Sequence, residues 1–426
     1  MTAIRTKIIS RLPTFLTMVA FFVSISGCVS TTGGYSSSNA PYTVGPARMQ
    51  EKIVVADSNR KKHEAVDLSV LVLPLDPNLP KNTDEYAEEG IWPELRRAEG
   101  NRFAVKIRDA LSESSTFRSA RVVPGKDATG NLYVSGKILQ SNGENVKLAI
   151  TVTAITGEVL IKNKTYSHRV KEYELENPRN RSDYDLYQPI FDEIAWDISQ
   201  KVRKLPERQV TDMNIVEELR FGESFSPEYF SPYLETSERG ITRLVSAPAD
   251  QDMMLKRTRE LRIRDKLFID DLQKDYNNFS IQMWDAYQLW QRQSYVESKA
   301  ARKAKNKEIG KKILGVVALA GGIALAATAG DTNSSGAAAQ ALGGTVLAAA
   351  GFGVVASSAG DSADAAMHKE SMNELGRSLN IDLAPKVIQM EERTVELKGD
   401  ASEQYSIWRS FLLDLYQLDK TPNISL

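Results

Sequence analysis

Side chains that could carry out covalent or metal chemistry are scarce in this sequence. The 426 residues contain one cysteine, Cys28, and the three histidines lie in separate segments, at His63, His168 and His368. Zinc and iron sites need several ligands at short, regular spacing, so we expect no metal or cofactor. The sequence also contains no GxSxG serine motif and no phosphate-binding glycine loop after a strand. These patterns argue against an enzyme and direct attention to the single thiol.

Two acidic residues near aromatic side chains, Asp183 and Asp185, are the remaining catalytic candidates. A glycosidase would need two opposed carboxylates in one cleft. We interpret these two instead as the solvated start of a helix, where carboxylates interact favourably with the helix dipole.

The first 27 residues have the order of a secretory signal. Three basic residues and no acidic residue precede an apolar run over residues 12–25. Two small residues, Ser26 and Gly27, follow immediately before Cys28. The apolar run is shorter than the roughly 20 residues that a membrane-spanning helix requires. We therefore predict a signal peptide over residues 1–27, cleaved between Gly27 and Cys28.

The segment Ile-Ser-Gly-Cys at residues 25–28 resembles the lipobox of bacterial lipoproteins. The resemblance implies that the Cys28 thiol receives a diacylglyceryl group and that the new amine is acylated after cleavage. Several acyl chains make a stable anchor, since each buried CH₂ contributes about 0.8 kcal/mol. Val29 follows Cys28, where an Asp would imply retention at the inner membrane. We therefore expect a lipid anchor in the outer membrane, with the protein facing the periplasm; a buried core cysteine is the alternative.

The charge balance of the chain is mild. Its formal net charge is −1, and removal of residues 1–27 takes away three positive charges and leaves about −4. This gives no electrostatic support to a nucleic-acid partner. Residues 28–48 combine the lipidated cysteine with a segment rich in Ser, Thr and Gly, which predicts a flexible tether.

Residues 49–205 are predicted to form an α/β sandwich, with helices packed on a mainly antiparallel sheet. The continuous apolar run at residues 68–75 is typical of a strand buried on both faces, and alternation at residues 146–154 indicates a half-buried strand. The other expected strands and helices complete the order β-α-β-β-β-β-α: strands at 118–124, 132–138 and 158–168, and helices at 92–113 and 183–204.

This order resembles the α/β domain shared by curli-secretion and Pel-export lipoproteins and by the N-terminal domain of TolB. The resemblance covers somewhat over a third of the chain. It is carried by the segments LSVLVLPL, NRFAVKIRDALSES, RSARVVP, NLYVSGKI and VKLAITVTAITGEVL. Members of this group are non-enzymatic envelope proteins that form rings or bind periplasmic partners. The long C-terminal part departs from their pattern, so the resemblance implies a fold but neither a secretion-channel role nor any functional residue.

Residues 206–250 are an aromatic connector with two open interpretations. The first is a set of short helices docked on neighbouring elements, which we favour because prolines interrupt the segment. The second is an exposed aromatic surface for peptidoglycan or another glycan. The aromatic residues are Phe221, Phe225, Tyr229, Phe230 and Tyr233.

A long helical region follows. Residues 251–312 contain apolar positions at helical spacing and no proline, which predicts one long amphipathic helix or two joined end to end. Such a helix needs a partner to cover its apolar stripe. Residues 359–426 are predicted to supply it as shorter C-terminal helices, interrupted at Pro385 and Gly399.

The segment 313–358 consists of two uncharged, Gly/Ala-rich arms around a polar turn, which predicts an apolar helical hairpin. Small residues at every fourth position allow close helix contact, and the pattern resembles the glycine-zipper segments of bacterial envelope proteins. Basic residues before the segment could meet anionic lipid headgroups. Insertion into a membrane or an oligomeric pore and packing within a soluble assembly both remain open. The candidate contact residues are Gly315, Gly322, Gly343, Gly351 and Gly353.

The sequence thus predicts an α+β protein with an α/β sandwich followed by a long helical region. The leading functional hypothesis is a non-enzymatic outer-membrane lipoprotein that acts in envelope assembly or surface export, as a homo-oligomer or bound to an envelope partner. A peptidoglycan- or glycan-binding lipoprotein is the alternative, and a carbohydrate-active enzyme with an unrecognised site is the third.

Overall fold

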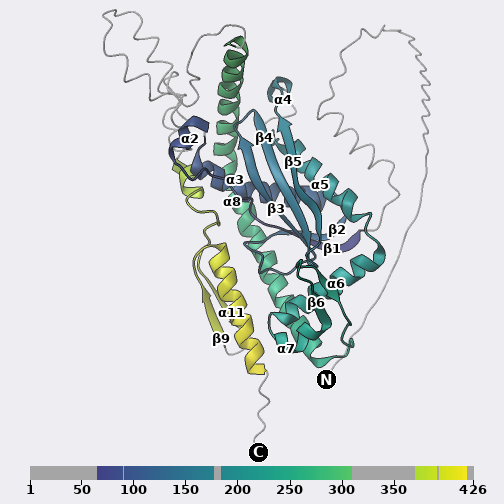
Figure 1. Cartoon of the computed structure of the whole chain (residues 1–426). Coiled ribbons are helices and arrows are strands. Elements are labelled where there is room, and N and C mark those ends of the chain that lie inside the picture. The colour runs from purple at the N-terminus through teal and green to yellow at the C-terminus, as the bar shows by residue number, and fades with distance from the viewer. Residues whose placement is uncertain (1–64, 90, 177–183, 309–369, 391–392, 420–426) are drawn as a thin grey trace, which may run out of the picture. The chain divides into compact units, whose positions relative to one another are not determined.

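The computed structural model describes residues 65–89, 91–176, 184–308, 370–390 and 393–419 (Figure 1). Cys28 and Gly27, the predicted tether and the apolar segment 313–358 lie outside the described residues. The five candidate glycines of that segment lie outside them as well: Gly315, Gly322, Gly343, Gly351 and Gly353.

A five-stranded sheet forms the centre of the α/β part, in the order β2-β1-β3-β4-β5. β1 pairs in parallel with β2 and β3, whereas β3, β4 and β5 form an antiparallel meander. Strand β1 is buried along nearly its whole length, which confirms the interpretation of the apolar run at 68–75. The strands are β1 (Val66–Val72), β2 (Phe117–Val122), β3 (Leu132–Ser141), β4 (Asn145–Ala154) and β5 (Val159–Arg169).

Two helices pack together against this sheet. α3 (Pro93–Glu113) is the crossover that the parallel β1–β2 pair requires, and it begins with a proline at its first position. α5 (Gln188–Val202) contacts α3 and β5. Its residues Ile190, Ile194 and Ile198 are fully buried, because a four-residue step places them on one helix face. The expected mixed fold and the element order are therefore confirmed, with two short helices added: α2 (Asp84–Glu89) and α4 (Glu172–Glu176).

The predicted connector is more regular than expected. Its first part is a 17-residue helix, α6 (Glu207–Glu223), which packs against β1 and the long helix that follows. Phe221, Phe225 and Phe230 are buried, so these three rings do not form the exposed aromatic surface that the glycan alternative requires. The remaining elements are small: α7 (Pro227–Phe230), the 3-10 turn η2 (Ser231–Tyr233), β6 (Leu234–Thr236) and β7 (Thr242–Leu244).

A single helix of 56 residues, α8 (Met253–Glu308), follows and confirms the predicted long amphipathic helix. At 1.5 Å per residue it is about 84 Å long. It contacts α3, β2 and α6, and Figure 1 shows it running alongside the sheet. No helix among the described residues is both long and apolar enough to cross a membrane.

The C-terminal part supplies the expected partner for α8, but only partly as helix. α11 (Ala401–Asp419) packs on α8, where the rings of Phe268 and Trp408 stack with centroids 5.1 Å apart. The expectation of helix before Gly399 is wrong at residues 386–397, because β8 (Lys386–Met390) and β9 (Arg393–Leu397) form a hairpin. β-Branched residues are frequent there, and exposure alternates along β8 as in a half-buried strand.

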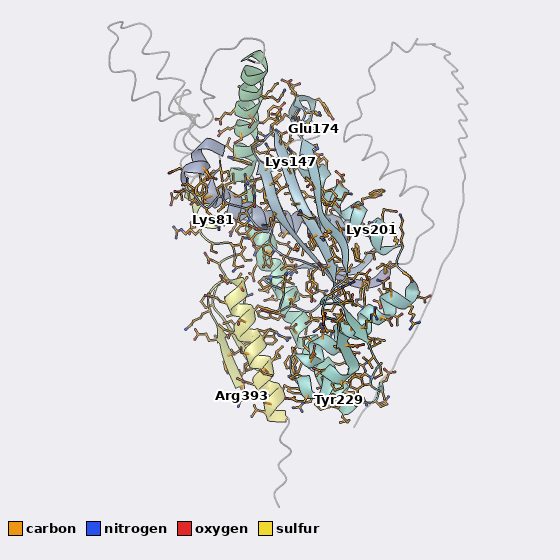
Figure 2. The ribbon with its side chains drawn as sticks, viewed as in Figure 1. Lys81, Lys147, Glu174, Lys201, Tyr229 and Arg393 are labelled. Carbon is orange, nitrogen blue, oxygen red and sulfur yellow. The ribbon has the colours of Figure 1, made fainter. Side chains whose placement is uncertain are left out.

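One hydrophobic core joins these elements. It contains Leu68 of β1, Ile190 of α5, Tyr276 of α8 and Trp408 of α11. Side chains fill the space between the ribbons, while exposed charges such as those of Lys147 and Lys201 lie on the outside (Figure 2). The α/β part and the long helix therefore fold as one unit and hold the polar groups between them in fixed positions.

Candidate functional site

Arg102 on α3 is a buried charge at the contact with α8. Its Nη2 donates to Asp185 Oδ2 at 2.7 Å, and the two side chains are only 1% and 2% exposed. The guanidinium also lies over the rings of Trp284 and Tyr287, with its carbon 4.5 and 4.7 Å from their centroids. The interpretation of Asp185 as a solvated helix start is thus wrong, because its carboxylate neutralises a buried arginine; Asp183 lies outside the described residues.

Glu99, one turn before Arg102, extends this buried polar layer. Its carboxylate accepts hydrogen bonds from Ser141 Oγ and from Tyr287 Oη, and lies 3.3 Å from Arg96 Nε. Burial raises the pKa of Glu99, against the opposing effect of Arg96. The groups are enclosed and paired with one another across β3, α3 and α8. This part of the layer therefore holds the long helix to the sheet and is not open to a ligand.

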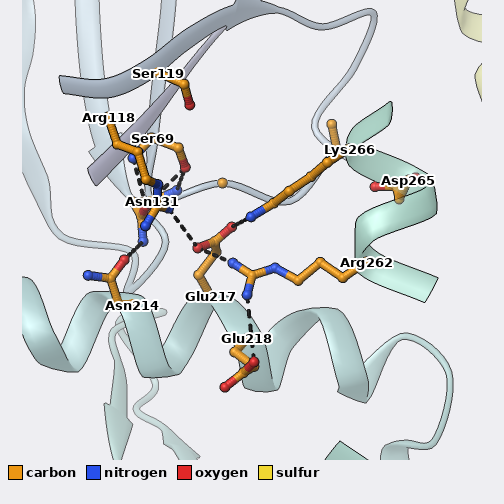
Figure 3. A network of polar contacts seen from close by, with 12 residues as sticks. Ser69, Arg118, Ser119, Asn131, Asn214, Glu217, Glu218, Arg262, Asp265 and Lys266 are labelled. Carbon is orange, nitrogen blue, oxygen red and sulfur yellow. Dashed lines mark hydrogen bonds and ion pairs between the residues drawn. The ribbon is translucent and has the colours of Figure 1, made fainter. Parts of the chain in front are cut away.

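A second charged cluster lies between α6, α8 and the sheet (Figure 3). Its centre is Glu217 of α6, whose carboxylate is 1% exposed and forms ion pairs with three cations. Arg262 and Lys266 come from successive turns of α8, and Arg118 comes from β2. Burial lowers the pKa of Lys266, because its ammonium is partly withdrawn from water. The ion pairs of this one carboxylate therefore connect α6, α8 and β2.

Asn131, just before β3, connects this cluster to the sheet. Its side-chain oxygen accepts from both the backbone N–H and the hydroxyl of Ser69, at 2.8 and 2.9 Å. Its Nδ2 donates to Asn214 Oδ1 at 3.0 Å. A fully buried amide that reaches both β1 and α6 fixes the position of α6 at this end of the sheet.

A third group joins α8 to α11. The hydroxyl of Tyr405 donates to the carboxylate of Asp265, with oxygen distances of 3.3 and 3.2 Å. Burial raises the pKa of Asp265, although Arg409 Nη1 lies 3.7 Å away and opposes the shift. Arg409 also lies over the rings of Phe221 and Phe225, 4.8 Å from each centroid. Arg409 thus connects α11 with α8 and the end of α6.

A cavity of about 450 Å³ opens next to this third group, and we take it as the candidate functional site. Its walls come from the loop between β2 and β3, from β3 and the end of β4, from α6 and from α11. The residues that could contact a ligand through charge or hydroxyl groups include Lys126, Tyr133, Arg220, Tyr405, Ser406 and Arg409.

The chemistry of the cavity suits reversible binding. Cations and hydroxyls dominate its polar lining, and burial raises the pKa of Tyr133 to about 12, so this phenol stays protonated at neutral pH. His168 lies away from the cavity on β5, buried beside Glu174 at 3.7 Å. Among the residues that the structure describes, no group of three or more His, Cys, Asp or Glu side chains could hold a metal ion.

The sequence did not predict the buried polar clusters or the cavity. Nothing in the sequence spacing distinguishes the buried charges from charges that face solvent. Each lies among other charged residues of an amphipathic helix, as the neighbours of Arg102, Glu217 and Arg409 show. The one available signal is indirect: a long helix without proline or glycine must be covered by neighbours, so some of its polar groups become buried.

Comparisons of the chain with protein families, with curated proteins and with solved structures gave no significant match.

Proposed function

We propose that this chain is a non-enzymatic, lipid-anchored protein of the outer membrane that acts in envelope assembly or surface export. The observation that carries the proposal is the position of Cys28, directly behind a segment with the residue order of a secretory signal and ahead of a Ser/Thr/Gly-rich segment. The folded unit would then dock on an envelope partner or on further copies of the chain.

The attachment of α8 supports a scaffold role. Its contacts with α3 include the packing of the buried Arg102 guanidinium on the rings of Trp284 and Tyr287, which holds the helix along the sheet. Residues 309–312 alone separate its end at Glu308 from the Gly/Ala-rich segment 313–358. Lys299 and Arg302 near its end are paired with Glu172 and Glu144, which fixes this end to the sheet side.

Membrane fractionation of four forms of the full chain tests the proposal. Wild type should sediment with outer membranes and be released by detergent, since its acyl chains anchor it. The double variant with Cys28→Ser and residues 313–358 deleted should be soluble. Cys28→Ser alone and the deletion alone then show whether the acylated cysteine or residues 313–358 attach the protein to the membrane.

Ser30→Ala, two residues beyond the anchor, is the matched control and should sediment like wild type. Labelling with a radioactive fatty acid should mark wild type and the Ser30→Ala variant but not Cys28→Ser. Sedimentation of the unlabelled double variant together with wild type would contradict lipid anchoring through Cys28.

A further inference from the structure

The candidate cavity has the size and composition of a small-molecule site. Ligand pockets commonly enclose about 300–1,000 Å³, and this cavity of about 450 Å³ falls inside that range. It is formed by four separate parts of the chain, which the buried clusters around Glu217 and Asp265 hold in place. A site built on such fixed elements is preorganised, so binding requires little ordering of side chains.

Positive charge prevails in the lining. Lys126, Arg220 and Arg409 contribute three cations, whereas Asp127 is the one carboxylate among the lining residues. Lys126 is exposed and forms no ion pair with any described residue. Arg220 is engaged with Glu223 at 3.1 Å and Thr242 at 2.5 Å, so it contributes little free charge. Lys126 and Arg409 are therefore the cations available to a ligand.

Arg409 keeps unused hydrogen-bonding capacity at the wall of the cavity. Its Nη2 donates to Ser224 Oγ at 2.6 Å, but its Nη1 is buried without an acceptor among the described residues. The nearest carboxylate oxygen, on Asp265, is 3.7 Å away and too distant for a hydrogen bond. The Arg409 side chain as a whole is 16% exposed and lines the cavity, so an anionic oxygen there can form a charge-assisted contact with it.

Hydroxyl groups complete the polar lining. Thr129 and Ser406 line the cavity and form no hydrogen bond with another described side chain, so both can donate to or accept from a ligand. Ser410 donates to the backbone oxygen of Ser406 at 3.0 Å and can still accept. Lining of this kind favours a ligand with several hydroxyl groups over an apolar one.

We propose that the cavity between α6, α11 and the β2–β3 loop binds a small polyhydroxylated molecule that carries one anionic group, a carboxylate or a phosphate. Lys126 and Arg409 contact the anionic group, and the serine and threonine hydroxyls contact the rest of the ligand. This site does not depend on the lipid anchor. If the cavity binds no such molecule, the proposed anchoring through Cys28 is unaffected.

Isothermal titration calorimetry on the full chain in non-ionic detergent tests the proposal with three probes of similar size. Glucose 6-phosphate and glucuronate separate the phosphate from the carboxylate source, and glucose is the neutral control. We expect at least one anionic probe to bind at least tenfold more tightly than glucose, because hydrogen bonds to a charged group are roughly twice as strong as those between neutral groups. Absence of binding by both anions, or equal binding of glucose, would overturn the proposal.

Two exposed positions test the location. Lys126→Glu and Ser406→Glu each place a negative charge at the cavity wall and should weaken binding of the anionic probe at least tenfold. Lys162→Glu makes the same charge change as Lys126→Glu at an exposed position of β5, away from the lining, and should leave the affinity within twofold. Thermal unfolding curves identify any variant that does not fold. Unchanged affinity in both folded cavity variants would overturn the assignment of the site.

Discussion

Arg102→Ala should lower the free energy of unfolding by about 3–5 kcal/mol, because it leaves the Asp185 carboxylate buried without a counter-charge. The substitution also removes the stacking of the guanidinium on Trp284 and Tyr287. Urea denaturation of the full chain in detergent, followed by tryptophan fluorescence, measures the change. Trp284, one of the five tryptophans of the chain, lies beside the altered site and contributes to this signal.

Lys106→Ala, one turn further along α3, is the matched control. Its ammonium lies 5.6 Å from the Trp284 ring and is only partly buried, so the loss should stay below about 1 kcal/mol. Removing both charges, with Arg102→Met and Asp185→Leu together, should recover part of the stability, because no unpaired charge then remains. An Arg102→Ala variant as stable as the Lys106→Ala variant would show that neither the buried ion pair nor the packing of Arg102 on α8 stabilises the fold.

Gly143→Ala is the second substitution with a large expected effect. Gly143, in the turn between β3 and β4, has a φ of +78°, and an added Cβ would lie 2.5 Å from the backbone N of Tyr295. The turn therefore packs directly on the backbone of α8. A left-handed residue costs about 1–2 kcal/mol and overpacking about 1–3 kcal/mol, so we expect a loss of about 2–5 kcal/mol in the same urea experiment.

Gly125→Ala provides the comparison for this prediction. No atom lies within 4 Å of the Cβ that it would add, and its φ is not positive. The expected change is within about 1 kcal/mol, because the alanine restricts the unfolded chain without meeting a neighbour. If Gly143→Ala and Gly125→Ala lowered the free energy of unfolding equally, the close contact between the β3–β4 turn and α8 would be contradicted.

Periodicity in the sequence predicts the long and regular elements well. The apolar run of β1, the face of α3 and the 56-residue α8 each repeat their pattern over enough residues to determine the element type. The hairpin at residues 386–397 was missed, because two five-residue strands carry a short pattern and their pairing depends on packing against α11.

The candidate site could not be predicted in the same way. Lys126 and Arg409 are far apart in the sequence, and they line the same cavity only because α11 packs on α8 and brings Arg409 to the side of the β2–β3 loop. Asp185 shows the same limit. Its spacing fits a solvated helix start, while its burial depends on Arg102 from a helix much earlier in the chain. A single sequence does not show which of its charged residues become buried in the fold.

The mass of the intact protein purified from outer membranes tests the lipid anchor most directly. We predict the mass of residues 28–426 increased by a diacylglyceryl group and a third acyl chain, with the additions located on the first residue, Cys28. A chain that keeps residues 1–27, or one whose Cys28 thiol is free, would contradict the anchor and with it the proposed place of this protein in the envelope.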